Sequence, residues 1–232
     1  MKKKTIILIT VLSSMAGFFL LQNINLSKQI EEAKKFEEVQ KVNQNMQEMQ
    51  GYFASKLVSV DFDKNYDSWV TSMDVADQLH EDSDGNFKKE WGLFLAELSQ
   101  QHEIDPFIVY ELLKTETGGT FDPTLVGPET RFGHAYGLAQ FMKNTAPWIA
   151  DMADLPYNDE LLFDPLYSIQ LSVTYLDFLY NKYNDWDHAL TAYHRGMGGL
   201  ETYLGENGHA KSAYAVEIQD GAKQFDLIAY NK

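Results

Sequence analysis

The sequence predicts an all-α, mainly helical domain, and three observations support this prediction. Beyond Lys89, apolar residues recur at steps of three and four, as they do on the buried face of a helix. Asp105-Pro106 and Asp164-Pro165 each place a capping residue before a proline, which is a helix start signal. No stretch alternates between apolar and polar residues for long, so we expect no substantial sheet.

These signals predict five helices within a domain at residues 89–232. The first carries a stripe that includes Trp91 and Leu98, and the second must end at Gly118-Gly119, because glycine adopts the left-handed conformation of a helix terminus. The expected helices start near Lys89, at Asp105, at Asp164, at Asp185 or Asp187, and near Ala210.

The N-terminus predicts a membrane anchor over residues 1–22. Three lysines follow Met1, and the stretch from Thr5 to Leu21 carries no charge, which suits a short membrane span. Basic residues before such a span stay cytoplasmic, so the remaining chain would lie outside the membrane. A signal peptide that is cleaved, with secretion of the rest, is the alternative, and a buried soluble helix is a further one.

Residues 23–60 and 61–88 predict a spacer and a linker. Phe36, Val39, Val42 and Met46 recur at helical spacing in a polar segment, which predicts an amphipathic helix or a coiled coil that could bind a protein partner. A solvated spacer helix that packs on its own domain is the alternative. Residues 61–88 are acidic and weakly patterned, as in a linker or docking segment.

Composition excludes several classes of function. The formal net charge is −15, so the chain lacks the positive surface that nucleic-acid binding requires. It has no cysteine, which removes disulfides, thiolate metal sites and a cysteine nucleophile. The spacing of His102, His134, His188 and His194 fits no metal motif, and we expect no metal or cofactor.

Glu116 is a candidate general acid. It lies at the predicted end of a helix, where the negative end of the helix dipole favours a protonated carboxyl group. Desolvation by Phe121 would raise its pKa further. A carboxylic acid that is protonated near neutral pH can donate the proton that cleavage of a glycosidic bond requires. On local grounds alone, Glu111 of the same helix is an equally good candidate.

Two further segments could bind a sugar. In Tyr136-Gly137-Leu138-Ala139-Gln140, glycine allows a ligand to approach the backbone, and Gln140 can donate and accept hydrogen bonds. In Ala192-Tyr193-His194-Arg195-Gly196, Tyr193 offers an aromatic face and a hydroxyl group. Taken alone, each segment is better explained without a ligand, the first as a loop before a helix and the second as a core tyrosine at a helix end.

The order and spacing of these segments resemble the soluble-type lytic transglycosylase family, whose domain has the lysozyme-like fold. The resemblance covers roughly residues 90–230 and rests on four motifs in register. They are Glu116-Thr117 leading to Phe121-Asp122-Pro123, Gly137-Leu138-Ala139-Gln140, Asp164-Pro165, and Ala192-Tyr193-His194-Arg195-Gly196. The whole layout also resembles lytic enzymes of conjugative or transposon-related elements of Gram-positive bacteria.

The resemblance implies cleavage of peptidoglycan glycan strands with Glu116 as the single catalytic carboxylate. Glu116 would protonate the oxygen between N-acetylmuramic acid and N-acetylglucosamine, and a 1,6-anhydro ring would then close. Gln140 and Tyr193 would position the sugar. Thr117 stands where the family has serine and His194 where it has asparagine, and both are expected at the substrate. The loop from Thr124 to Tyr136 is longer than in the commonest form.

Two other functions are compatible with the same residues. A muramidase, which hydrolyses the bond on the same scaffold, would need a second carboxylate to activate water, and Asp122, Glu129, Asp151 and Asp164 are available. A non-catalytic wall-binding scaffold of an export or conjugation apparatus would need no acid at all. Retention of Glu116 argues against the scaffold.

Overall fold

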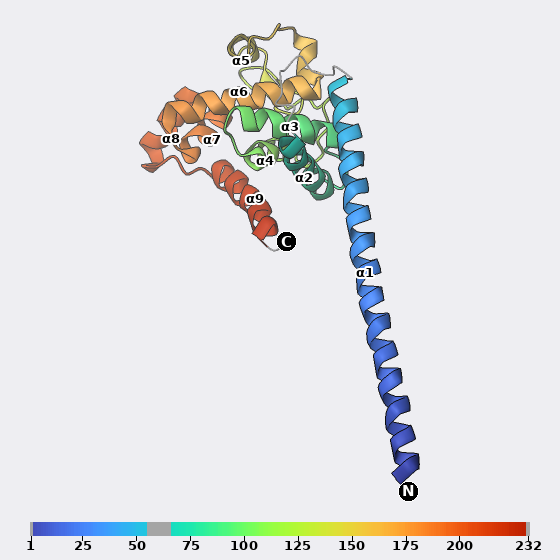
Figure 1. The fold of residues 1–232 in the computed structure, drawn as a ribbon. Helices are drawn as coiled ribbons and strands as arrows, with labels where there is room; N and C mark the ends of the chain where they lie inside the picture. Colours follow the sequence, from blue (N-terminus) through green and yellow to red (C-terminus); the bar gives the residue numbers. More distant parts are fainter. Residues whose placement is uncertain (1, 55–65, 231–232) are drawn as a thin grey trace. The chain divides into compact units, whose positions relative to one another are not determined.

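The computed structural model describes residues 2–54 and 66–230, and the side chains of residues 2–18, 21, 50, 52–54 and 226–230 are not described (Figure 1). The chain divides into two units, residues 1–60 and 61–232. The described residues of the first unit form one helix, and the second unit contains the helical domain with every candidate site residue.

Helix α1 (Lys2–Ala54) is continuous, so the predicted anchor and spacer belong to a single helix. The anchor prediction rests on residues 5–21, and most of their side chains lie outside the described residues. Among the residues that the structure describes, no helix has both the length and the apolar character needed to span a membrane. Four apolar residues of the predicted spacer, Phe36, Val39, Val42 and Met46, are exposed. Residues 55–60 of the predicted spacer lie outside the described ones.

The second unit is mainly helical. Its long helix α6 contacts α3, α4, α5, α7 and the 3-10 helix η1, while α9 contacts α4 and α7 (Figure 1). The elements are α2 (Tyr66–Asp82), α3 (Lys89–Gln101), α4 (Pro106–Glu116), β1 (Ala135–Tyr136), β2 (Phe141–Met142), α5 (Ala146–Met152), η1 (Asp159–Phe163), α6 (Pro165–Tyr183), α7 (Trp186–Arg195), α8 (Met197–Asn207) and α9 (Ala213–Tyr230).

Three of the five predicted helix starts are confirmed by their side-chain caps. The Asp105 side chain accepts a hydrogen bond from the backbone N–H of Phe107 at 2.9 Å, and Asp164 accepts one from Tyr167 at the same distance. Of the two candidates for the start of α7, Asp185 is the cap, and it accepts a hydrogen bond from the N–H of His188 at 2.9 Å. These contacts satisfy N–H groups that have no partner within the helix.

The prediction of a linker over residues 61–88 was wrong. Helix α2 forms within this segment and is part of the domain. Its buried residues, which include Trp69, Ala76 and Leu79, recur at helical spacing. Gly92 of α3 lies against the backbone of Ala76, where a β-carbon at position 92 would clash, so the two helices approach closely. The acidic residues between the buried positions made the segment resemble a linker.

A short hairpin interrupts the helices. β1 pairs with β2 in antiparallel register, with Ala135 opposite Met142 and Tyr136 opposite Phe141. The turn between them includes Gly137 and Gln140, whose φ angles are 72° and 48°. Gly137 also packs against the carbonyl oxygen of Leu162, which leaves no room for a side chain. The hairpin is too short to show a period-two pattern, so it was not predicted.

Candidate active site

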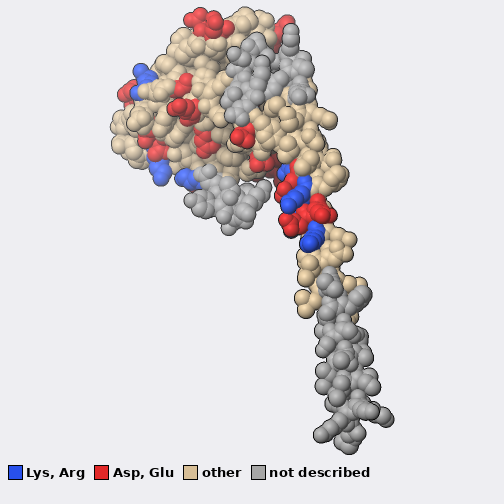
Figure 2. Space-filling view, viewed as in Figure 1, with Lys and Arg blue, Asp and Glu red and all other residues tan. Residues whose placement is uncertain are grey.

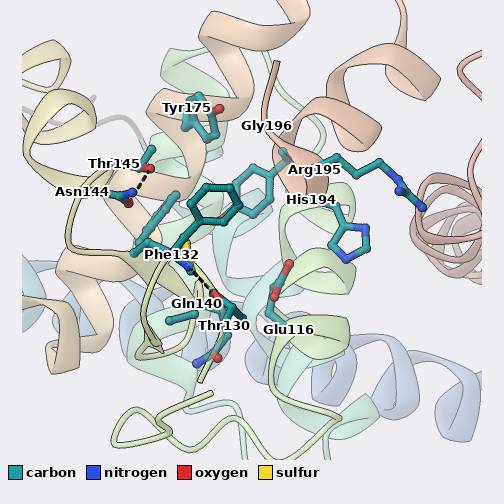
Figure 3. Close-up of a pocket in the computed structure, with 14 residues that line it drawn as sticks. Glu116, Thr130, Phe132, Gln140, Asn144, Thr145, Tyr175, His194, Arg195 and Gly196 are labelled. Carbon is teal, nitrogen blue, oxygen red and sulfur yellow. Dashed lines mark hydrogen bonds between the residues drawn. The ribbon is translucent and has the colours of Figure 1, made fainter. Parts of the chain in front are cut away.

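The three segments that carry the candidate residues meet at one pocket, a cavity of about 540 Å³. Glu116 comes from the end of α4, Gln140 from the β1–β2 turn, and Tyr193 and His194 from the end of α7 (Figure 3). The lining residues are Glu116, Thr130, Phe132, Ala135, Gln140, Phe141, Met142, Asn144, Thr145, Tyr175, Tyr193, His194, Arg195 and Gly196.

Glu116 is the last residue of α4, because Gly118 and Gly119 follow with φ angles of 59° and 78° and end the helix. Burial raises the pKa of the Glu116 carboxyl group to about 7. The hydroxyl group of Tyr214 donates a hydrogen bond to Oε1 at 2.6 Å, which opposes part of this rise. The group can therefore donate and accept a proton near neutral pH.

The environment that raises this pKa differs from the one expected. Phe121 was expected to desolvate Glu116, but it packs in the core against Phe87 and Tyr110, with ring centroids 5.1 and 5.2 Å away. Phe121 does not line the pocket. Glu116 instead lies in the pocket wall, where the Tyr214 hydroxyl group contacts it.

The structure separates Glu116 from Glu111, which the local sequence could not do. Oε1 of Glu111 accepts a hydrogen bond from Lys114 at 3.1 Å, and the same carboxylate lies against Gly221 of α9. Lys114 also donates to Asp82 of α2 at 2.7 Å. Glu111 therefore belongs to an ion-paired cluster between α2 and α4 that packs against α9, and it does not line the pocket.

Thr117, expected at the substrate, supports the end of the helix instead. Its hydroxyl group donates to the carbonyl oxygen of Leu113 at 2.7 Å and accepts from the N–H of Phe121 at 3.2 Å. The side chain is buried and does not line the pocket. Thr117 thus stabilises the turn that follows Glu116, and its hydroxyl group is already used in these two hydrogen bonds.

Gln140 lines the pocket as expected, and its amide also holds the neighbouring loop. Nε2 donates to the carbonyl oxygens of Gly137 at 2.8 Å and Leu125 at 3.4 Å. Oε1 lies close to Gly127, where any side chain would clash with it. Because both ends of the amide contact the loop, the position of the Gln140 side chain is fixed before any ligand binds.

Tyr193 belongs to an aromatic wall of the pocket. Its ring centroid lies 5.4 Å from that of Tyr175 and 5.5 Å from that of Phe141, and its hydroxyl group donates to the carbonyl oxygen of Ala139 at 3.1 Å. This hydrogen bond joins α7 to the hairpin. Tyr193 therefore offers a fixed aromatic face to the cavity, as the sequence predicted from its type.

His194 and Tyr214 form a stacked pair beside the acid, and sequence reasoning missed the role of Tyr214. The two rings are 4.5 Å apart and nearly parallel, at 11°. Partial burial and the charge of Arg195 lower the pKa of His194, which favours the neutral form of the ring. Burial and the proximity of Glu116 raise the pKa of Tyr214, which keeps its hydroxyl group a donor. A hydroxyl group on an otherwise apolar helix face was the only signal for Tyr214.

None of the four carboxylates considered as a second catalytic group lines the pocket, among the residues described. Asp122 caps a turn by accepting hydrogen bonds from the N–H and hydroxyl groups of Thr124, each at 2.8 Å. Asp164 is the cap of α6, and Glu129 and Asp151 are exposed. Within the described part of the chain, no cluster of three or more His, Asp or Glu residues could hold a metal ion.

The sequence matches a family model, the Transglycosylase SLT domain, over residues 94–216. The match covers more than half of the chain and includes the four motifs, and the chain belongs to this family. No curated protein matches it.

Two solved structures are similar to this chain. One is an inactive mutant of the lytic transglycosylase Slt from Pseudomonas aeruginosa, with 17% identity, a TM-score of 0.43, and coverage of 74% of this chain and 29% of that one. The other is the 70 kDa soluble lytic transglycosylase from Escherichia coli, with 20% identity, a TM-score of 0.41, and coverage of 68% and 28%. The chain therefore spans less than a third of the length of either protein.

Proposed function

We propose that the protein is a peptidoglycan lytic transglycosylase that cleaves the bond between N-acetylmuramic acid and N-acetylglucosamine. The observation that supports this most directly is Glu116, a carboxyl group with a pKa of about 7 in the wall of the pocket. Membership of the Transglycosylase SLT domain family supports the same activity. The aromatic wall and the fixed amide of Gln140 suit the faces and the N-acetyl group of a sugar.

In the first step, protonated Glu116 donates its proton to the glycosidic oxygen as the bond from that oxygen to the muramyl C1 breaks. The leaving N-acetylglucosamine takes the proton and becomes a free hydroxyl end. The resulting carboxylate is stabilised by the hydrogen bond from Tyr214. This step needs no metal ion. The proton from Glu116 neutralises the negative charge that would otherwise develop on the leaving oxygen.

In the second step, the Glu116 carboxylate removes the proton of the muramyl 6-hydroxyl group, whose oxygen bonds to C1. The ring closes as a 1,6-anhydro sugar, no water is consumed, and Glu116 is protonated again. A hydrolase that activates water directly would use a second carboxylate about 6.5–9.5 Å from the first. Since no other described carboxylate lines the pocket, attack by the substrate's own hydroxyl group is the simpler chemistry.

The test is product analysis on purified peptidoglycan. The wild-type chain should release fragments that end in anhydromuramyl groups and resist reduction by borohydride. Glu116→Gln should release at least a hundredfold less, since general acid catalysis contributes on the order of 100- to 10,000-fold. A majority of reducible ends would instead identify a muramidase. Release equal to that of Glu116→Gln would identify a wall-binding module.

We also propose that the domain acts outside the cytoplasm, where its substrate lies. The lysine cluster and the uncharged stretch from Thr5 to Leu21 support either an anchor or an export signal. Fractionation of cells that express the chain, with protease added from outside, separates these cases. Intact membrane-bound chain that external protease removes fits the anchor, a shortened chain in the medium fits cleavage, and a protected chain contradicts both.

A further inference from the structure

Helix α1 carries a stripe of apolar side chains on one side, formed by Val39, Val42, Met46 and Met49. The first three are exposed and Met49 is partly exposed, while the other residues from 37 to 48 are polar. Steps of three, four and three residues place the four side chains on one side of an α-helix. Single exposed apolar residues are ordinary, but a continuous stripe indicates a surface that another element covers.

The spacing of the stripe is that of a coiled-coil seam. Alternating steps of three and four residues average 3.5, and the sequence continues them from Met49 to Phe53. Such a seam is narrower than the apolar face of a helix that packs on a globular core. Because 3.5 differs from the 3.6 residues of one helical turn, the seam is best covered by a helix that winds around it with the same repeat. A second copy of α1 has this repeat.

The charges of α1 are balanced, unlike those of the rest of the chain. Over residues 28–41, four lysines alternate with four glutamates, and Figure 2 shows these side chains as a block of mixed sign on the helix. Residues 61–232 contain 29 acidic residues against 11 basic ones, so two copies of this unit repel one another. Charge therefore permits contact between two copies along α1 and opposes it between their helical domains.

The residues that flank the stripe also suit a second copy in parallel orientation. When Val39 occupies the first core position of the repeat, Glu38 and Asn43 occupy the two flanking positions that meet across a parallel pair. The Asn43 amide of one copy can donate a hydrogen bond to the Glu38 carboxylate of the other. At this level of the seam, no like charges would face each other.

We propose that the protein self-associates through α1, as a parallel coiled coil in which the stripe from Val39 to Met49 packs in register against the same stripe of a second copy. The seam is short, so the dimer should be reversible and its amount should depend on protein concentration. Each dimer would carry two copies of the helical domain. The inference does not depend on the reaction that the pocket catalyses.

Cross-linking tests the contact and its register in the full chain, purified in detergent micelles. The chain contains no cysteine, so a single introduced cysteine reports on contact between copies. Val39→Cys and Met46→Cys should each form a disulfide-linked dimer on mild oxidation, because a parallel pair in register brings equal core positions within reach of a disulfide. Gln44→Cys is the matched control, since Gln44 is exposed on the opposite side of the helix.

The outcomes of this experiment are distinct. The control should stay monomeric at the protein concentration at which the two core variants cross-link. Cross-linking at only one of the two core positions would contradict the parallel register. Equal cross-linking at all three positions would show random collision, and it would overturn the inference, as would the absence of any cross-link.

Sedimentation equilibrium of the cysteine-free chain measures the strength of the association. Val42→Glu/Met46→Glu should raise the dissociation constant at least about a hundredfold, because the dimer would bury unpaired like charges in its seam. Gln40→Glu/Gln44→Glu adds the same two charges away from the stripe and should change the dissociation constant by less than about threefold. Circular dichroism should show the same helix content in both variants as in the wild type.

Two results would overturn the inference. If the wild-type chain is a monomer at every concentration, the stripe is covered by another protein or by the chain's own domain. If a dimer forms but neither pair of substitutions weakens it, a different surface holds the two copies together.

Discussion

Tyr214 on α9 donates a hydrogen bond of 2.6 Å to Glu116 on α4, across 98 residues of sequence. α9 contacts α4, so the last helix of the domain holds the Glu116 carboxyl group and lowers its pKa below the value that burial alone would give. The same tyrosine ring stacks on His194 at the end of α7. Three helices thus converge on one carboxyl group, because Tyr214 of α9 contacts both Glu116 of α4 and His194 of α7.

Tyr214→Phe should move the pH dependence of cleavage towards higher pH. The hydroxyl group stabilises the charged form of Glu116, so its removal raises a pKa that is already about 7. A general acid loses activity as pH rises through its pKa, and the descending limb of kcat/KM should shift upward by about one pH unit. Profiles of both chains between pH 5 and 9 measure this shift. An unchanged limb, with only a lower rate, would show that Tyr214 orients the acid without tuning it.

Glu116→Gln should make the protein more stable at high pH and leave it nearly unchanged at low pH. The folded-state pKa of about 7 lies above the ordinary glutamate value of 4.5, so the folded chain binds more protons, and wild-type stability falls as pH rises from about 4.5 to 7. Glutamine does not ionise, so the variant does not lose stability in this way as pH rises. At pH 8 the gain should approach about 3 kcal/mol, less the contribution of the Tyr214 hydrogen bond. Urea unfolding at pH 4.5 and pH 8 measures both differences, and an equal difference at the two pH values would contradict the raised pKa.

Local signals explain which parts of the fold could be predicted. Asp105, Asp164 and Asp185 act within three residues of their own positions, so their helix starts were readable from the sequence. Helix α8 was not predicted, because it begins at Met197-Gly198-Gly199, where glycine disfavours a helix and contact with α7 supports it.

The site residues, too, could be predicted only where a local sequence signal marks them. Glu116, Gln140 and Tyr193 were predicted as site residues because their motifs lie in order along the chain, and all three line the pocket. Thr117 was assigned to the substrate by the same motif, but its hydroxyl group is used by the local hydrogen bonds of the helix end. The role of Tyr214 depends on how α9 packs on α4, and no short segment of sequence contains that information.

Phe132 should contribute to substrate binding and little to stability. Its side chain lines the pocket and yet is 60% exposed, at the tip of a turn closed by hydrogen bonds between Thr130 and Gly133. Phe132→Ala should raise KM about five- to tenfold by removing an aromatic face that a sugar can stack on, with kcat nearly unchanged. Phe132→Trp should keep KM within about twofold of wild type. A fall in kcat without a change in KM would place Phe132 in the chemical step instead.

Gly137→Ala should unfold or severely destabilise the domain. Its φ of 72° disfavours an alanine, and the added β-carbon would meet the carbonyl oxygen of Leu162, which precedes α6. A backbone carbonyl group cannot move aside as the end of a flexible side chain can. The free energy of unfolding should therefore fall by more than about 2 kcal/mol.

Gly205→Ala is the matched control for this substitution. Gly205 lies within α8 with nothing within 4 Å of its added β-carbon, so alanine should stabilise the domain by about 0.5–1 kcal/mol. Thermal unfolding of both variants separates the effects. If Gly137→Ala melts at the wild-type temperature, the hairpin and the segment before α6 do not pack as closely as the structure shows. The hairpin could not then hold Gln140 against the pocket.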